Sequence, residues 1–146
     1  MKRLFAFLAA LVVAGLFAAP AFAQATAPGA ASARERVIIQ ISTPEQRIWA
    51  QSLNYAENLR ALYGKDNVEI EIVALGFGIG VLKLDSPMAT RVAETIKNGV
   101  GVHACQVTMG RQKLEKADML PDIGYVPAGL GQIIKRQKEG WNYISG

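Results

Sequence analysis

Residues 68–80 read VEIEIVALGFGIG, a run that first alternates polar and apolar residues and is then wholly apolar over 72–75. This pattern is typical of a strand that enters the middle of a sheet. Glycines at positions 76, 78 and 80 follow at once, which indicates a tight backbone turn at the carboxyl end of the strand. Because ligands of open α/β sheets gather at such strand ends, we expect Gly76, Gly78 and Gly80 to line a binding pocket.

The glycine run differs from the two common phosphate-binding patterns. The dinucleotide fingerprint G-x-G-x-x-G follows the first strand and opens directly into a helix, whereas this run has another spacing and follows the second expected strand. The pattern G-x-x-x-x-G-K-[ST] does not occur in the chain. A structural turn is therefore the favoured interpretation, and nucleotide binding is the least favoured function.

Upstream of this run, the sequence predicts a strand and a long helix. Residues 37–41 are a β-branched run typical of a buried strand. Thr43 and Pro44 suit the cap and the first position of a helix, and Gly64 is placed to end it. The apolar positions of this helix recur at steps of three and four residues, at Trp49, Leu53, Ala56, Leu59 and Tyr63.

Downstream, strand and helix signals continue to alternate. Further strands are expected at 100–104, 123–126 and 141–144, and further helices from Ser86-Pro87 to Asn98-Gly99 and over 128–139, with a helical turn at 114–117. Such alternation predicts one α/β domain over residues 35–146. We expect a three-layer α/β/α sandwich around a mostly parallel sheet of about five strands.

The amino terminus has the pattern of a secretion signal. Lys2 and Arg3 precede an uncharged apolar run over residues 4–19, Pro20 interrupts the run, and Ala21 and Ala23 are the small residues that a signal peptidase reads. We therefore predict a cleavable signal peptide over residues 1–23, with cleavage between Ala23 and Gln24. The mature protein would be periplasmic or secreted and would keep no stable membrane anchor.

Residues 24–34 are rich in Ala, Pro, Gly and Ser and lack hydrophobic periodicity, which predicts a disordered lead-in. The formal charge of +4 falls to +2 once Lys2 and Arg3 are removed. This small positive charge is spread thinly along the chain and argues against nucleic acid as a partner. The basic cluster Lys135, Arg136 and Lys138 has Glu139 beside it and is interpreted as a solvated helix face.

Cys105 is the one cysteine of the chain, so an internal disulfide is impossible. It stands at the carboxyl end of the third expected strand, where a following helix or the nearby Arg111 and Lys113 could stabilise a thiolate. A buried cysteine that packs as a small hydrophobe is the competing interpretation. A single thiol could form a mixed disulfide or hold a sulfur atom as a persulfide.

His103 precedes Cys105 by two residues, which on a strand places both side chains on one face about 6 to 7 Å apart. That separation is too large for the direct contact that a Cys/His hydrolase needs. One His and one Cys cannot complete a metal site, so we expect no metal and no cofactor. His103 is interpreted as a half-buried strand residue or a neighbour that accepts a proton.

The order of these features resembles the DsrE/DsrF-like (sulfur relay) family over nearly all of the mature chain. The resemblance rests on segments at 54–59 (NYAENL), 73–78 (VALGFG) with Leu82, 85–87 (DSP), 99–100 (GV), 104–105 (AC), 108–109 (TM), 118–121 (DMLP), 126–129 (VPAG) and 137–141 (QKEGW). Val107 departs from the pattern, because the family often has Asn at that place. The well-understood relay members also work in the cytoplasm.

The resemblance implies a flavodoxin-like fold and a homo-oligomer or mixed ring. It also implies that Cys105 carries a persulfide, which makes the protein at most a sulfurtransferase-like sulfur carrier. The partners would be a sulfane sulfur donor and a protein acceptor, and the expected binding residues are Gly76, Gly78, Gly80, Thr108 and His103. The alternative function is a non-catalytic binding or oligomer-forming α/β module in which Cys105 is merely packed.

Overall fold

The computed structural model describes residues 34–146. The predicted signal peptide (1–23) and the predicted lead-in up to residue 33 lie outside the described residues. The elements follow one another as β1 (Glu35–Ile41), α1 (Gln46–Tyr63), β2 (Val68–Ala74), the 3-10 helix η1 (Gly76–Leu82), α2 (Ala89–Lys97), β3 (Gly101–Cys105), α3 (Gln106–Gln112), the 3-10 helix η2 (Lys116–Asp118), β4 (Gly124–Val126), α4 (Gly129–Lys138) and β5 (Asn142–Ser145). In this part of the chain, no helix combines the length and the apolar character that crossing a membrane requires.

The sheet has five strands in the order β4-β3-β2-β1-β5, and all four strand pairs are parallel. The strand count and the α/β class predicted from the sequence are therefore confirmed. The chain steps along the sheet from β1 to β4 and then returns to place β5 beside β1. Crossovers between parallel strands are right-handed, so a connection that runs back along the sheet places its helix on the opposite face.

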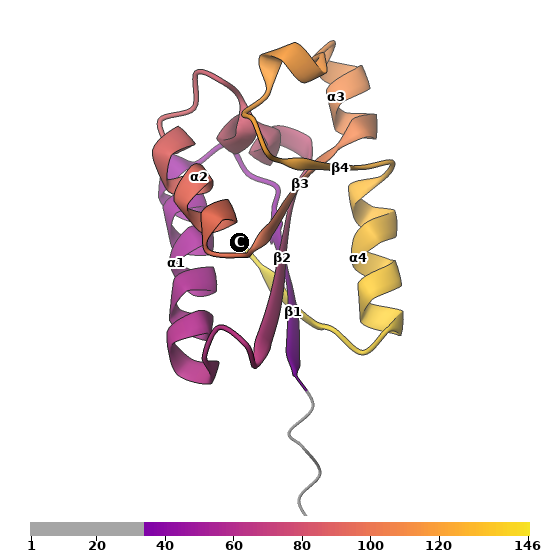
Figure 1. Ribbon diagram of the computed structural model, residues 1–146. Helices are drawn as coiled ribbons and strands as arrows, with labels where there is room; N and C mark the ends of the chain where they lie inside the picture. The colour runs from indigo at the N-terminus through magenta and orange to yellow at the C-terminus, as the bar shows by residue number, and fades with distance from the viewer. Residues whose placement is uncertain (1–33) are drawn as a thin grey trace, which may run out of the picture. The chain divides into compact units, whose positions relative to one another are not determined.

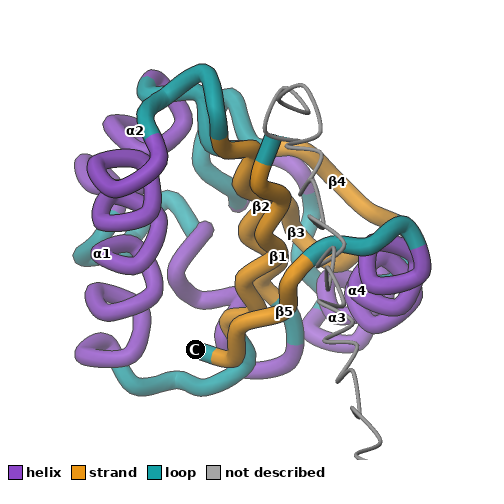
Figure 2. Tube along the Cα trace, turned by 90° about the horizontal axis from the view of Figure 1, so that it is seen from below, coloured by secondary structure: helices purple, strands orange, loops and turns teal. Residues whose placement is uncertain are grey.

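The helices follow this rule. Figures 1 and 2 show α1 and α2 on one face of the sheet and α4 on the other, which makes the three layers expected from the sequence. The two faces are unequal. The larger apolar cluster includes Trp49, Leu53 and Val92 from α1 and α2, whereas a smaller cluster contains Ile133 from α4 and the neighbouring Trp141.

Two helices begin later than the sequence predicts. The first helix begins at Gln46 and not at Pro44, and the Thr43 carbonyl accepts a hydrogen bond of 2.7 Å from Trp49 Nε1. The Thr43-Pro44 segment therefore binds the Trp49 side chain and does not form the first turn of the helix. The second helix, α2, begins at Ala89, because Ser86 Oγ accepts from Met88 N–H at 3.2 Å in a turn ahead of the helix.

The largest difference lies after Cys105, where the sequence suggested a polar stretch and a helical turn at 114–117. The structure instead has α3 directly after the cysteine, and its short helix η2 begins at Lys116. Helix α3 has weak local propensity, since Val107, Thr108 and Gly110 are poor helix formers. Tertiary contacts compensate, because Thr108 and Met109 are buried and Val107 N–H donates to Pro127 O at 3.2 Å.

Candidate functional site

Three neighbouring strand ends meet at one edge of the sheet. Strand β3 lies between β2 and β4, and the chain continues from these strands into η1, α3 and α4. Between these segments lies an open hollow of about 220 Å³, lined by Leu75, Gly76, Cys105, Val107, Thr108, Arg111, Ala128, Gly129 and Leu130. The sheet topology therefore places Cys105 in a surface depression made by all three connections.

Cys105 ends β3 and occupies the N-cap position of α3. The residue is 4% exposed, and its Sγ accepts a hydrogen bond of 3.1 Å from Gly129 N–H at the start of α4. Burial by itself would raise the pKa of the thiol. The Thr108 side chain and the N–H groups of Gly129, Thr108 and Val107 outweigh that effect and hold the pKa of Cys105 below its ordinary value of 9.0. The site therefore favours the thiolate, which is the nucleophilic form of cysteine.

Gly129 permits the close approach of α4 to the thiol. A Cβ at this position would lie 3.2 Å from Cys105 Cβ and 3.1 Å from Leu75 Cβ, closer than ordinary side-chain contacts. The sequence contained Gly129 only as part of a family segment and gave no reason to assign it to the site. Its role follows from a contact between β3 and α4 that spans 24 positions of the chain.

Two of the residues predicted for the site, Gly76 and Thr108, lie beside Cys105. Gly76 N–H donates to Thr108 Oγ1 at 3.0 Å, and Gln112 Nε2 donates to Gly76 O at 3.0 Å. These bonds tie η1 to α3. Gly76 has a φ of 56°, a left-handed backbone conformation that suits glycine.

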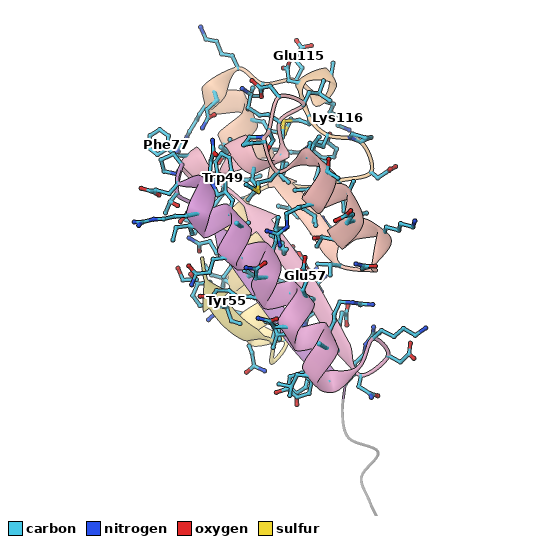
Figure 3. All side chains as sticks on the ribbon, turned by 90° about the vertical axis from the view of Figure 1, so that its left-hand side faces the viewer. Trp49, Tyr55, Glu57, Phe77, Glu115 and Lys116 are labelled. Carbon is cyan, nitrogen blue, oxygen red and sulfur yellow. The ribbon has the colours of Figure 1, made fainter. Side chains whose placement is uncertain are left out.

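A second hollow, of about 290 Å³, adjoins the first and shares Gly76, Thr108 and Arg111 with it, while Phe77 and Gln112 complete its walls. The Phe77 side chain is 75% exposed, and Figure 3 labels it at the outer margin of the molecule. Arg111 thus lines both hollows. Lys113, the other cation expected near the thiol, lines neither.

The structure places Gly78 and Gly80 away from the hollow. A Cβ on Gly78 would stand 2.3 Å from Ile41 O, and a Cβ on Gly80 would stand 3.0 Å from the ring of Trp49. Trp49 lies near the start of α1, at its upper end in Figure 3. These two glycines therefore let η1 pack against β1 and α1, and of the three predicted glycines Gly76 alone lines the hollow that contains Cys105.

The His103 side chain faces Glu71 and not Cys105. Its Nε2 lies 3.7 Å from Glu71 Oε1, and its ring occupies the space that a Cβ on Gly124 or Gly101 would need. Among the described residues, no hydrogen bond joins His103 to Cys105. Burial lowers the pKa of His103 below its ordinary value of 6.5, Arg136 lowers it further, and Glu71 opposes both effects. His103 is therefore neutral at pH 7 and belongs to a polar cluster under α4.

This polar cluster centres on a buried carboxylate that the sequence analysis did not single out. Glu71 is 3% exposed and accepts hydrogen bonds of 2.6 Å from both Gln132 Nε2 and Arg136 Nε. The signal in the sequence was a second glutamate within the otherwise apolar strand VEIEIVA. Alternation alone made that glutamate appear solvent-facing.

Other sites offer less chemistry. Within residues 34–146, no group of three His, Cys, Asp or Glu side chains is arranged to hold a metal ion. A larger hollow of about 430 Å³ lies beside α2, where mostly aliphatic side chains from Ala89 to Ile96 face Leu120 and Pro121. Its charged lining residues are Lys97 and Asp122, and it contains no thiol, so the Cys105 hollow is the candidate site.

Similar folds occur in solved structures of proteins from distant organisms. A protein of unknown function from Methanobacterium thermoautotrophicum is 32% identical and superposes with a TM-score of 0.73, over 77% of this chain and 99% of that one. A conserved protein of unknown function from Bacteroides thetaiotaomicron is 20% identical, with a TM-score of 0.65, over 81% and 100% of the two chains. The ychN protein from E. coli is 12% identical, with a TM-score of 0.63, over 77% and 99%. The last two likenesses show the fold alone.

No curated protein matches the chain. The model of the DsrE/DsrF-like family matches residues 35–145, which is almost the whole of the described domain. The solved structure at 32% identity covers the same domain. The protein belongs to the DsrE/DsrF-like family.

Proposed function

We propose that the protein is a sulfur carrier that holds a sulfane sulfur atom as a persulfide on Cys105. The observation that carries this proposal is the Cys105 thiol itself, which lies in an open hollow at a sheet edge with a hydrogen bond from Gly129 N–H and a lowered pKa. Family membership supports sulfur relay as the general process. A lowered pKa increases the thiolate fraction at neutral pH, which is what nucleophilic attack on sulfur requires.

Formation of the persulfide needs no reagent beyond the donor. With thiosulfate as donor, the Cys105 thiolate attacks the outer, sulfane sulfur. A new S–S bond forms at Cys105, the S–S bond of thiosulfate breaks, and sulfite leaves with the electron pair of that bond. An acceptor thiolate then attacks the outer sulfur of the persulfide, takes it as its own persulfide, and returns Cys105 as a thiolate.

We also propose that the predicted signal peptide is cleaved before Gln24 and that the carrier acts in the periplasm or outside the cell. The acceptor would be a protein thiol in that compartment, and the carrier would act as a homo-oligomer. Amino-terminal sequencing of the exported form tests the cleavage site, and light scattering of the purified mature chain tests the assembly state. A mature chain that begins elsewhere, or one that is monomeric, overturns the corresponding part of the proposal.

Intact-mass spectrometry tests the carrier function. The mature protein, residues 24–146, is incubated with thiosulfate or polysulfide, and we expect its mass to rise by one sulfur atom that a thiol reductant removes. Cys105→Ser is the matched control and should gain none. A wild-type protein that gains no sulfur, or a variant that gains as much as the wild type, contradicts the proposal.

The alternative, a binding or oligomer-forming module with a packed cysteine, is favoured by the low exposure of Cys105, which is 4%. Thiol labelling of the folded protein separates the two functions. A packed thiol reacts slowly at every pH. The labelling rate of an activated thiol instead rises with pH, and the midpoint of that rise lies below the ordinary cysteine pKa of 9.0.

A further inference from the structure

Helix α4 supplies the N–H group that contacts Cys105, so the position of this helix along the sheet matters to the thiol. The apolar contacts beneath α4 are few, with Ile133 packed among Ile38, Val73, Val126 and Trp141. Hydrophobic contacts are not directional. They therefore hold α4 against the sheet but do not by themselves determine how far it can slide along its axis.

Directional contacts come from the Glu71 carboxylate on β2. Its Oε1 accepts from Gln132 Nε2 and its Oε2 accepts from Arg136 Nε, both at 2.6 Å. The two donors stand three and seven positions after Gly129 on α4, which is the spacing of residues on one side of a helix. One buried carboxylate thus binds the same side of the helix that begins with the N–H donor to Cys105.

The same helix is held at its other end. Arg136 also donates to Glu139 Oε2 at 3.0 Å, and its guanidinium lies 4.5 Å from the centre of the Trp141 ring. Arg36 on β1 donates to Glu139 O at 2.7 Å. His103 faces Glu71 from β3 at 3.7 Å, with its pKa lowered. Arg136 therefore joins α4 to Glu71, Arg36 bonds to the residue after the helix, and the neutral His103 lies against the same carboxylate.

We propose that Glu71 and Gln132, with Arg136, are positioning residues that hold α4 where Gly129 N–H donates to Cys105 Sγ. A shift of one residue along a helix moves its start by about 1.5 Å. Such a shift would lengthen the contact of 3.1 Å beyond the range of a hydrogen bond. The proposal rests on the proposed function for its biological purpose, whereas the ionisation of the thiol can be measured without any sulfur transfer.

Glu71 could also influence the thiol directly, and this effect has the opposite sign. A nearby negative charge disfavours a thiolate, so loss of the Glu71 charge alone would lower the pKa of Cys105. Loss of the helix position would raise it, because the hydrogen bond from Gly129 would weaken. The direction of the change therefore distinguishes positioning from a simple charge effect.

The decisive experiment compares Gln132→Ala with Gln137→Ala, because both remove the same side chain from α4 without changing the net charge. Gln132 bonds to Glu71, whereas Gln137 is exposed. The readout is the rate of iodoacetamide alkylation of the mature protein, measured as a function of pH. The midpoint of this pH profile reports the pKa of the thiol, and it does not depend on how accessible the sulfur is. We expect Gln132→Ala to raise the midpoint and to slow alkylation at pH 7. The expected factor is about two- to tenfold, which corresponds to the net free energy of one hydrogen bond. Gln137→Ala should match the wild type.

Glu71→Gln gives a second test that keeps the shape of the side chain. We expect its midpoint to rise as well, and circular dichroism confirms that the variant is folded. Equal midpoints in Gln132→Ala and Gln137→Ala overturn the proposal, and so does a lowered midpoint in Glu71→Gln, which would mean that Glu71 acts through its charge. Failure of the wild type to take up sulfur would instead contradict the carrier function and leave these midpoints unaffected.

Discussion

At the scale of single residues, the thiol environment depends on Gly129. Its N–H donates to Cys105 Sγ, and its missing side chain leaves room for that contact. Thr108 acts on the same thiol from α3 and at the same time accepts from Gly76 N–H. The segments that follow three strands therefore all contribute to the surroundings of one sulfur atom, through Gly129, Gly76 and the Thr108 hydroxyl.

Replacing Gly129 with alanine should weaken this arrangement. The new Cβ would stand 3.1 to 3.2 Å from Leu75 and Cys105, closer than ordinary contact, so we expect the start of α4 to shift away from the sulfur. We expect the pKa of the thiol to rise toward 9.0 and alkylation at pH 7 to slow by about two- to tenfold. The measurement is the pH profile of alkylation.

Gly131→Ala is the matched control for this substitution. It adds the same methyl group to the same helix, where its Cβ would meet only the Ala128 Cβ at an ordinary distance of 3.6 Å. Its alkylation profile should match that of the wild type. Equal profiles for Gly129→Ala and the wild type would contradict the role assigned to the Gly129 contact.

At the scale of elements, η1 shows how one glycine run serves two purposes. Gly76 turns the chain at the edge of the hollow, while Gly78 and Gly80 bring η1 against β1 and Trp49. The run therefore belongs partly to the candidate site and partly to the core. Periodicity in the sequence could not show which glycines belong to the site and which to the core. That assignment depends on the Ile41 carbonyl and the Trp49 ring, which contact the glycine run from distant positions in the chain.

Gly78→Ala should mainly lower the stability of the fold, with a smaller effect on the pKa of the thiol. Its Cβ would lie 2.3 Å from Ile41 O, a backbone atom that cannot rotate away. We expect the free energy of unfolding, measured in urea, to fall by about 1 to 3 kcal/mol. Gly110→Ala in α3 is the control, since a Cβ there meets nothing within 4 Å, and it should leave stability unchanged or raise it by up to about 1 kcal/mol. Similar losses in both variants would contradict this account of η1.

Elements with strong local signals could be predicted from the sequence, and those built by tertiary contacts could not. The run VEIEIVA and the apolar spacing of α1 identified a central strand and a long helix. Helix α3 escaped prediction because its residues favour a helix weakly and contacts with Gly76 and Pro127 stabilise it. Gly129 and Glu71 escaped for the same reason, since their hydrogen-bond partners lie 24 and at least 61 positions away.

At the scale of the whole molecule, the two faces of the sheet have different chemistry. The α1 and α2 face holds most of the buried apolar side chains, whereas the α4 face contains Cys105, His103 and the Glu71 cluster. Parallel topology contributes to this asymmetry, because the return connection places the 10-residue α4 on one face, whereas the 18-residue α1 lies with α2 on the other. The face with the smaller core is therefore the one that carries the buried Glu71 carboxylate and the Cys105 thiol.

This arrangement predicts an acid-sensitive contribution to global stability. Burial lowers the pKa of His103 in the folded protein below its ordinary 6.5, so the unfolded chain takes up a proton first as the pH falls. Above 6.5 both states are neutral at this residue, and the contribution is constant. Between 6.5 and the lower folded pKa, the free energy of unfolding should decrease as the pH falls.

Urea unfolding at a series of pH values measures this effect. The control is His103→Gln, which keeps a polar side chain but does not titrate. We expect the wild type to lose stability relative to the variant as the pH falls below 6.5, and the difference to be constant above that pH. A difference that stays constant throughout, or a wild type that gains stability relative to the variant as the pH falls below 6.5, would contradict the assignment of a neutral, half-buried His103.

The central claim is that the Cys105 thiolate takes up the sulfane sulfur of a donor. Thiosulfate that carries radioactive sulfur in one of its two positions tests this claim most directly. If Cys105 attacks as proposed, outer-labelled thiosulfate leaves its label on the wild-type protein, inner-labelled thiosulfate releases its label as sulfite, and Cys105→Ser retains neither label. Retention of both labels by the protein, or of neither by the wild type, would contradict the claim.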